Sequence, residues 1–257
     1  MFSTRAFFSF VELTDQSKHW EYNEWHQLDH LPENLALDGV AWGQRWARRG
    51  EMRELGSAVQ KFANVDYTAM YWFKGDPDEA VREWTSLGEA TFQLGRGPLI
   101  PGVERRMLAF FEPVEGHAAP RIGVGPEVLP FRPNRGVHLT LTKYDEPHGL
   151  DTHERFRWES QELIPALLNV KGVAGAWTLT YHSGQKHSTL PMAFEDSTPY
   201  GGMRMRIVYM DGDPVKTARA IAAETARLDE ACDPGARAAE EVLLTGPVST
   251  ITPWEDW

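Results

Sequence analysis

The chain has 257 residues, a formal net charge of −11 and an aromatic share of 11%. This charge argues against nucleic-acid and anionic-membrane partners, because both are bound through clustered Lys and Arg. The single cysteine, Cys232, excludes an intramolecular disulfide framework and a cysteine-rich metal site. We therefore expect a reduced, cytoplasmic compartment. No stretch approaches the roughly 20 apolar residues of a membrane-spanning helix, so we also expect a soluble protein.

The chain contains two diverged copies of one unit. Residues 25–46 align without a gap with residues 158–179, at a shift of 158 − 25 = 133, and a tryptophan, a proline and a Gly-Val-Ala step recur at equivalent places. Downstream, the Gly-Asp-Pro step at 75–77 recurs at 212–214, at a shift of 212 − 75 = 137. Two matches in the same order and at nearly the same offset indicate a tandem duplication.

Each copy predicts the order strand, helix, strand, strand, helix, strand. In the first copy we expect strands at 6–13, 40–48, 67–74 and 103–112, with one helix before residue 39 and another after the first Gly-Asp-Pro step. In the second copy we expect strands at 137–144, 203–210 and 242–252, with a helix at 215–228. The predicted units are 1–113 and 136–257, joined by a linker at 114–135 that is rich in Pro and Gly. The long polar stretch 182–202 predicts a binding loop or lid, with disorder as the alternative.

The first predicted helix has an apolar stripe. Trp25, Leu28, Pro32 and Leu35 are spaced as i, i+3, i+7 and i+10, which predicts that they form one buried face. Pro32 lacks a backbone donor and clashes with the preceding turn, so we expect the helix to bend or end there.

The order of elements is the ferredoxin-like plan, and two such units in one chain resemble the dimeric α+β barrel superfamily. Residues 22–46 look like the signature of its EthD-like members. The His-Leu-Pro step at 30–32, the Gly-Val step at 39–40 and Arg45 occupy the places of that pattern, whereas Asp38 stands where proline is usual. The resemblance implies an α+β fold, a tandem duplication of ferredoxin-like βαββαβ units that form an intrachain dimeric α+β barrel.

The two copies keep the same framework and differ in their polar residues. Where the first copy has His26, His30, Glu33 and Arg45, the second has glutamate, leucine, alanine and threonine. The simplest interpretation is that the first unit carries an active pocket and the second is mainly structural. Two unrelated pockets are the alternative.

A set of polar residues in the first copy predicts acid/base chemistry. His26, His30 and Glu33 lie at i, i+4 and i+7 and share a helical face. Histidine suits proton transfer near neutral pH. We expect His30 to shuttle a proton at a carbon next to a carbonyl, His26 or Asp29 to orient it, and Arg45 to stabilise the enolate. The alternative is a solvated helix face with two ordinary histidines.

Aromatic and acidic side chains nearby are the predicted substrate-binding residues. They are Trp25, Asp29, Glu33, Trp42 and Tyr71. Trp42, together with Trp46 on the same strand face, either walls an aromatic pocket or fills the core. Tyr71 has the same two interpretations.

Cofactor sites have weaker signals. The spacing of His26 and His30 can hold one metal ion, but further ligands are not evident nearby, and we predict no metal. A single histidine can ligate haem, and the superfamily includes haem enzymes, yet no feature selects one histidine. Serine-nucleophile, P-loop and Rossmann motifs are absent from the sequence.

The sequence therefore predicts an enzyme that acts on a small apolar molecule, aromatic or polyketide-like, by cofactor-independent acid/base chemistry. The resemblance implies an isomerase, cyclase, dehydratase, decarboxylase or cofactor-free monooxygenase. A haem-binding dimeric α+β barrel enzyme and a non-catalytic ligand-binding or accessory protein remain as alternatives. An open pocket where His30 and Arg45 converge would favour the enzyme, and a closed, wholly apolar one the binding protein. Pairing into a homodimer through exposed sheet edges is also expected.

Overall fold

The computed structural model describes residues 4–96, 100–186 and 197–255. The main elements of the first unit are β1 (Ala6–Leu13), α1 (His19–Trp25), the π-helix η2 (His26–His30), α2 (Leu31–Leu35), β2 (Val40–Ala47), β4 (Tyr67–Phe73), α4 (Pro77–Gln93) and β5 (Val103–Ala118). Those of the second are β6 (Gly136–Lys143), α5 (Leu150–Trp158), the π-helix η6 (Glu159–Leu163), α6 (Ile164–Asn169), β7 (Val173–Gly184), β8 (Met203–Met210), α7 (Pro214–Asp229), α8 (Pro234–Ala238) and β9 (Glu241–Thr250). Short elements complete the chain: η1 (Gln16–Lys18), α3 (Glu51–Glu54), β3 (Ser57–Ala58), η3 (Gln60–Phe62), η4 (Pro120–Ile122) and η5 (Pro126–Phe131).

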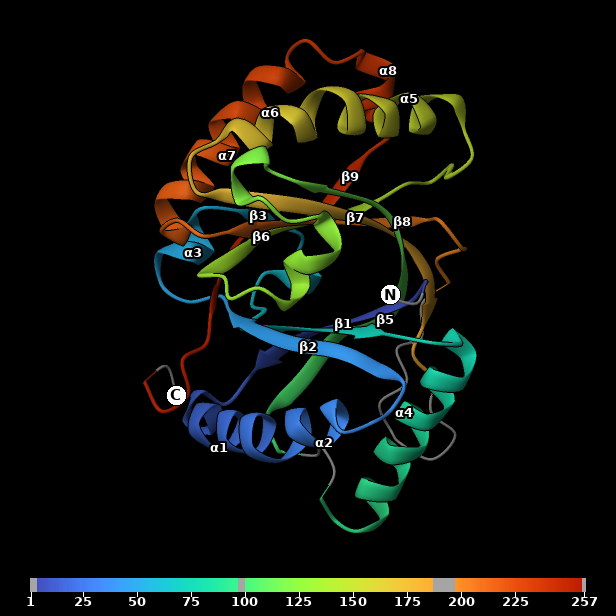
Figure 1. The fold of residues 1–257 in the computed structure, drawn as a ribbon, viewed down its shortest axis with the longest axis vertical. Coiled ribbons are helices and arrows are strands. Elements are labelled where there is room, and N and C mark those ends of the chain that lie inside the picture. The colour runs from blue at the N-terminus through green and yellow to red at the C-terminus, as the bar shows by residue number, and fades with distance from the viewer. Residues whose placement is uncertain (1–3, 97–99, 187–196, 256–257) are drawn as a thin grey trace.

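The strands close into one antiparallel barrel. Their order is β2-β4-β1-β5-β7-β8-β6-β9, and β9 pairs with β2 to complete the circle, while the short β3 adds to β9. Helices α1, α2 and α4 of the first unit cover one side of the barrel, and α5 to α8 of the second unit cover the opposite side, where the short α3 also lies (Figure 1). The predicted fold, two ferredoxin-like units that form an intrachain α+β barrel, is confirmed.

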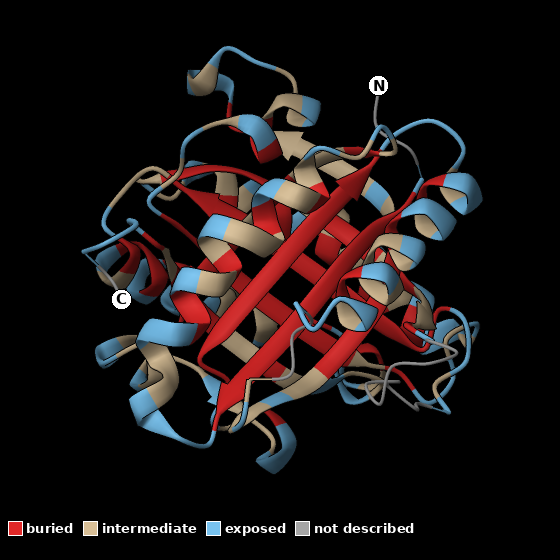
Figure 2. Cartoon of the chain, turned by 90° about the horizontal axis from the view of Figure 1, so that it is seen from below, coloured by how far each residue is buried: buried red, intermediate tan, exposed pale blue. Residues whose placement is uncertain are grey.

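Helices cover the outer face of the barrel and side chains fill its inside, so most strand residues are buried on either face, the polar ones Arg204 and Arg206 included. In the view through the helices of Figure 2, the strands behind them are almost entirely buried. Between the two sheets lies the barrel core, whose largest members include Phe8, Phe10, Trp46, Trp72 and Tyr209. A separate cluster, which includes Phe7, Leu31, Tyr71, Phe73, Trp84 and Phe110, fills the space between the first sheet and its helices.

The two seams between the units differ in length. β5 pairs with β7 over residues 109–118 and 175–184, whereas β2 meets β9 only at Trp46 and Ala47. Asn134, in the linker, strengthens the short seam: it accepts a hydrogen bond from Trp46 Nε1 at 3.1 Å and donates one to Gln44 at 3.1 Å. The predicted linker is therefore partly built into the barrel, because β5 continues to Ala118 instead of ending at 112.

The first helical segment departs from the predicted stripe. Leu28 is 51% exposed and Pro32 is exposed, so the prediction of one buried face through these residues is wrong. The physical reason is the π-helix His26–His30, whose wider turn shifts the residues that face the sheet. The helix also continues to Leu35 instead of ending at Pro32, since the π turn directly precedes the residue that lacks a backbone donor.

Two further expectations concern the chain outside these elements. Of the predicted loop 182–202, residues 187–196 lie outside the described residues. Within the described parts of the chain, no helix combines the length and apolar character needed to cross a bilayer.

Candidate functional site

A cavity lies between the first sheet and its helices. The helical segment 19–35 and α4 supply one side, and β1, β4 and β5 supply the other. It encloses about 70 Å³, room for a few water molecules or part of a small ligand. The side chains that give it chemical character are Tyr22, Trp25, His26, His30, Tyr71, Trp84 and Arg105. Four of the predicted site residues, Trp25, His26, His30 and Tyr71, are therefore brought together here.

His30 is held in a fixed orientation at this cavity. Its ring stacks on Trp25 with the centroids 4.6 Å apart and an interplanar angle of 21°. The Asn34 amide donates to the His30 backbone carbonyl at 2.7 Å and lies 3.2 and 3.3 Å from the two ring nitrogens. Burial, with the nearby charges of Arg105 and Arg45, lowers the pKa of His30 to about 3. The ring is therefore neutral at physiological pH.

His26 faces the same cavity and is almost fully buried. It is 3% exposed, and its ring meets that of His30 edge-on with the centroids 5.1 Å apart. Its Nδ1 atom has no hydrogen-bond partner among the described residues. Burial, Arg45 and His30 hold its pKa well below the usual histidine range. The site thus contains two neutral imidazoles side by side.

The cationic group that lines the cavity is Arg105, from β5. Arg45, the predicted enolate-stabilising residue, does not line it. Instead, Arg45 donates a hydrogen bond to Asn23 and lies against the Tyr22 and Tyr67 rings, 5.1 and 4.7 Å from their centroids. Arg45 still acts on the site at longer range, because its charge contributes to the lowered pKa of both histidines.

Asp29 and Glu33 point away from the cavity. Both form ion pairs with Arg96, which follows α4, and the Glu33 contact measures 3.2 Å. Their side chains are partly exposed, so these pairs tether the end of α4 to the helical segment at the surface. His30 is oriented by Trp25 and Asn34, and the Asp29 carboxylate pairs with Arg96 instead.

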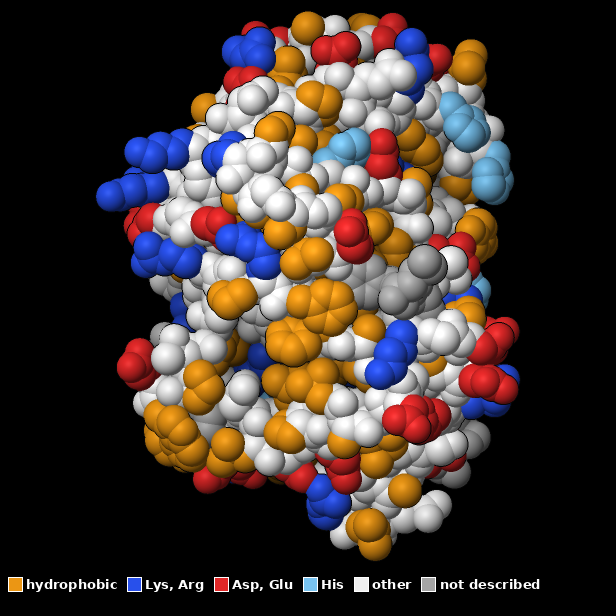
Figure 3. Space-filling model, in the orientation of Figure 1, with side chains coloured by type: hydrophobic (Ala, Val, Ile, Leu, Met, Phe, Trp, Pro, Cys, Tyr) orange, Lys and Arg blue, Asp and Glu red, His pale blue; other side chains and the backbone are white. Residues whose placement is uncertain are grey.

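Trp42 also lies away from the cavity. Its ring contacts Phe131 of η5 with the centroids 5.9 Å apart, on the linker side of β2. Hydrophobic side chains gather near the middle of the face in Figure 3, at the level where Figure 1 places β2 and this part of the linker. The neighbouring Trp46 is fully buried in the barrel core, which is the second of its two predicted interpretations.

Sequence reasoning missed several lining residues. Arg105 and Trp84 lie far from the histidines in sequence, and Gln185 comes from the second unit. Ser9 and Ala69 contribute by being small. Arg105 stands next to Glu104 and Arg106 in the sequence, so it resembled one of a run of ordinary strand or loop charges.

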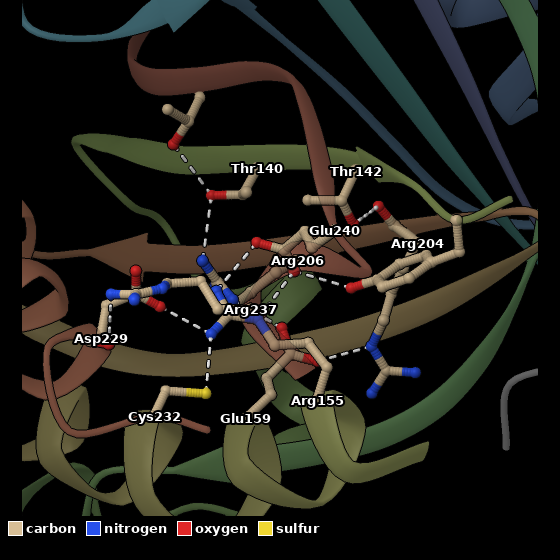
Figure 4. A network of polar contacts seen from close by, with 12 residues as sticks. Thr140, Thr142, Arg155, Glu159, Arg204, Arg206, Asp229, Cys232, Arg237 and Glu240 are labelled. Carbon is tan, nitrogen blue, oxygen red and sulfur yellow. Dashed lines mark hydrogen bonds and ion pairs between the residues drawn. The ribbon is translucent and has the colours of Figure 1, made fainter. Parts of the chain in front are cut away.

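The second unit fills the equivalent space with an ion network (Figure 4). Glu159, the counterpart of His26, accepts from Arg204 Nε at 2.5 Å and from Arg206 Nη1 at 2.6 Å. Arg204 also donates to Thr178, the counterpart of Arg45, and Arg206 to Thr140. Burial alone would raise the pKa of Glu159, but the two guanidinium groups lower it on balance. The carboxylate is therefore charged and paired.

A metal ion or haem would need suitable donor atoms and enough space in this cavity. In the described chain, no group of three or more His, Cys, Asp or Glu side chains is placed to hold a metal ion. The unpartnered Nδ1 of His26 is a donor atom that haem iron accepts. However, a pocket for even a drug-sized ligand measures roughly 300 Å³ or more, whereas this cavity encloses about 70 Å³. The residues present do not fit a porphyrin in this arrangement.

No family model and no curated protein matches the chain. Solved structures do match. A dye-decolorizing protein from V. cholerae has 8% identity and a TM-score of 0.54, covering 97% of this chain and 94% of that one. A dye-decolorizing peroxidase from Bacteroides thetaiotaomicron has 10% identity and a TM-score of 0.51, covering 97% and 94%. A candidate chlorite dismutase has 12% identity and a TM-score of 0.51, covering 97% and 96%.

At these identities the likeness shows a shared fold. The chain has an α+β barrel fold in which both ferredoxin-like units lie in one polypeptide. Within that architecture, function depends on the residues of the site.

Proposed function

We propose that the protein is an enzyme of the EthD-like type that removes a proton next to a carbonyl group of a small aromatic or polyketide-like molecule, without a cofactor. The observation that carries this proposal is the pair of adjacent imidazoles beside a guanidinium group in one aromatic-walled cavity. A neutral imidazole accepts a proton, and a nearby cation stabilises the enolate that forms.

His30 is the proton-transfer group in this proposal. It is oriented by Trp25 and Asn34, and the residue as a whole is half-buried. A half-buried histidine can return its proton to water after each turnover, whereas the almost fully buried His26 cannot do so directly. His26 instead offers its unpartnered Nδ1 to the bound molecule or to a water beside it.

Arg105 takes the role of enolate stabiliser in this arrangement. It lines the cavity, and its charge is felt at both histidines. Arg45 serves as a positioning residue, because it fastens the helical segment to the sheet through Asn23 and the tyrosine rings.

Four of the five candidate reactions share this first step, whereas a decarboxylase reaches the enolate by loss of carbon dioxide. An enolate can be reprotonated elsewhere, can expel a leaving group, can attack a second carbonyl or can react with dioxygen. These outcomes correspond to isomerase, dehydratase, cyclase and cofactor-free monooxygenase activities. Proton abstraction is therefore the step to test first.

The alternative function is non-catalytic ligand binding. The cavity meets neither of the two criteria: it is not wholly apolar, since two histidines and an arginine line it, and Arg45 does not converge on it with His30. A binding protein would nevertheless hold a ligand without exchanging its protons, and this difference separates the two functions.

The test is deuterium exchange at the α-carbon of 1-tetralone, an enolisable aromatic ketone, followed by NMR in heavy water. We expect the protein to accelerate the exchange and His30→Gln to lower the acceleration by about 10²–10⁴-fold, the usual contribution of a general base. His153→Gln, at an exposed histidine of the second unit, is the matched control. Exchange that equals the buffer rate, or that is unchanged in His30→Gln, contradicts the proposal.

A second measurement addresses the haem alternative. We expect the purified protein to show no Soret absorption, and added haemin to leave the exchange rate of 1-tetralone unchanged. A stoichiometric Soret band that disappears in His26→Gln or His30→Gln would contradict cofactor-independent chemistry.

A further inference from the structure

Two buried polar groups on the wall of the cavity have no partner in the described structure. They are the Tyr71 hydroxyl and Trp84 Nε1, and neither forms a hydrogen bond with a described residue. Asn34 lies near the Tyr71 hydroxyl, but no hydrogen bond of normal geometry joins them. Buried polar groups in folded proteins are nearly always paired, so two unpaired ones on a cavity wall indicate where a ligand atom binds.

Both groups have a hydrogen to donate. The indole N–H of Trp84 is a donor only. Burial raises the pKa of the Tyr71 hydroxyl, so this group keeps its hydrogen at physiological pH. The two rings lie on opposite walls, Tyr71 on β4 and Trp84 on α4, with their centroids 5.6 Å apart. The ligand atom that satisfies this pair must accept two hydrogen bonds.

A ketone oxygen has the properties that the two donors require. It carries two lone pairs and no hydrogen, so it can accept from both groups at once. A hydrocarbon edge in the same place leaves both donors buried and unpaired, which is strongly unfavourable. A water molecule can also accept from the two donors, and it is the species that a ligand oxygen displaces.

The position of Tyr71 relates this pair of donors to the histidines. The Tyr71 ring lies 5.6 Å from that of Trp84 and 6.4 Å from that of His30, measured between centroids. A ketone oxygen bound to the Tyr71 hydroxyl therefore lies in the same part of the cavity as the imidazole. Removal of a proton from the carbon next to the ketone requires this proximity.

The remaining lining residues select the body of the ligand. Phe7, Tyr22 and Trp25 supply flat aromatic walls, and Ala69 and Gly88 leave room between them. Aromatic walls of this kind pack well against another planar ring. The lining thus combines two donors for an oxygen with a surface for the ring that carries it.

We propose that Tyr71 and Trp84 form a carbonyl subsite, in which both donate a hydrogen bond to the oxygen of a neutral aromatic ketone and so select ketones against hydrocarbons of the same shape. The inference rests on the proposed function for the reaction that follows at the adjacent carbon. The subsite itself is tested by equilibrium binding, which requires no turnover.

The experiment is equilibrium dialysis of the intact protein with 1-tetralone and with tetralin, which has a methylene group in place of the carbonyl. We expect 1-tetralone to bind at least about tenfold more tightly, because tetralin leaves two donors unpaired. Tyr71→Phe and Trp84→Phe each remove one donor and keep an aromatic ring, so each weakens ketone binding about tenfold and changes tetralin binding by less than about threefold. The double variant prefers tetralin, because nothing then offsets the hydration that the ketone loses.

Two control variants make the same chemical changes outside the cavity. Trp42→Phe removes an indole N–H that is also buried and without a described partner, but Trp42 lies against Phe131 on the linker side of β2. Tyr209→Phe removes a buried hydroxyl from the barrel core. We expect both controls to leave the affinity for 1-tetralone unchanged.

Infrared difference spectroscopy separates hydrogen bonding from a merely structural role of the two side chains. The ligand is 1-tetralone with an isotope label at the carbonyl carbon. Each hydrogen bond to the oxygen weakens the C=O bond and lowers its stretching frequency. We expect the bound ketone to have its lowest frequency in the unchanged protein, a higher one in each single variant and the highest in the double variant.

The inference is overturned by equal affinity for 1-tetralone and tetralin, or by a C=O frequency that is the same in the unchanged protein and both single variants. The fate of the proposed function is separate. If both proposals hold, His30→Gln keeps the preference for the ketone and loses deuterium exchange. Exchange that depends on His30 without a preference for the ketone overturns the carbonyl subsite alone, and a preference without exchange overturns the proton-transfer function alone.

Discussion

The two units build the same interface between helix and sheet and use it in opposite ways. In the first, Ser9 pairs with Ala69 across β1 and β4, and these small side chains border the cavity. In the second, the equivalent register pairs Thr140 with Arg206, and the long arginine enters the space toward Glu159. The same π turn carries His26 in one unit and Glu159 in the other.

This difference shows that the two units keep the same fold although side chains fill, in the second unit, the space that is a cavity in the first. A few substitutions replace empty space and neutral histidines with paired charges. The charges must then be satisfied as a group, because a buried ion without its partner is strongly destabilising. The framework of tryptophan, proline and glycine does not need to change.

The largest effect is expected in the second unit. Glu159→Gln leaves Arg204 and Arg206 buried without a counter-charge, so we expect it to lower the free energy of unfolding by about 3–5 kcal/mol in urea denaturation. Glu162→Gln, at an exposed position of the same π turn, is the control and changes stability by less than about 0.5 kcal/mol. A loss below about 1 kcal/mol for Glu159→Gln would show that the network does not hold the second unit together.

The next effect concerns acid stability. His138 is 6% exposed, and burial together with Arg206 lowers its pKa to about 3. The unfolded chain therefore binds a proton below about pH 6.5 that the folded chain does not, and stability falls as the pH is lowered. Between pH 7 and pH 5, we expect the free energy of unfolding to fall by about 2 kcal/mol less in His138→Leu than in the unchanged protein. The measurement is urea denaturation at both pH values with the exposed His153→Leu as control, and an unchanged loss in His138→Leu contradicts the expectation.

Filling the cavity of the first unit should affect binding more than folding. Ala69→Val adds two methyl groups to the lining, so we expect the acceleration of deuterium exchange in 1-tetralone to fall at least tenfold, with stability unchanged within about 1 kcal/mol. Ala109→Val makes the same change in the filled barrel core and is expected to cost about 1–3 kcal/mol of stability. Equal destabilisation by both variants would mean that the space beside Ala69 is not available to a ligand.

The smallest effect is expected at the outer face of the helical segment. Asp29→Asn weakens a partly exposed ion pair with Arg96, so we expect a loss of no more than about 1 kcal/mol of stability. The rate of deuterium exchange should stay within about twofold, because the Asp29 carboxylate pairs with Arg96 instead of orienting His30. A drop in exchange comparable to that of His30→Gln would restore Asp29 to the orienting role that the sequence suggested.

The fold was predictable because the same order of strands and helices can be read from both copies of the repeat. The matching Gly-Val-Ala and Gly-Asp-Pro steps mark the same turns in both copies, and every major strand predicted between them is present. The contrast of His26 with Glu159 and His30 with Leu163 also located the region of the cavity. These signals are local in the sequence, which is why a single sequence could carry them.

The remainder of the site was not predictable for physical reasons. A π turn has no signature in the spacing of apolar residues, so the stripe through Leu28 and Pro32 was assigned to the wrong face. Arg105 reaches the histidines only through strand pairing between β1 and β5. The small side chain of Ala69 can be recognised as a cavity-forming residue only by comparison with Arg206, its equivalent in the second unit, and that comparison requires the strand registers.

The contrast between the two units depends most directly on the histidines of the first unit being neutral. The decisive measurement is an NMR titration of the His26 and His30 rings in the folded protein between pH 8 and pH 5. The structure predicts that both rings stay neutral over this range, because burial and the charges of Arg45 and Arg105 disfavour the imidazolium form. A protonation step of the His30 ring near pH 6.5, with the protein still folded, would contradict the account.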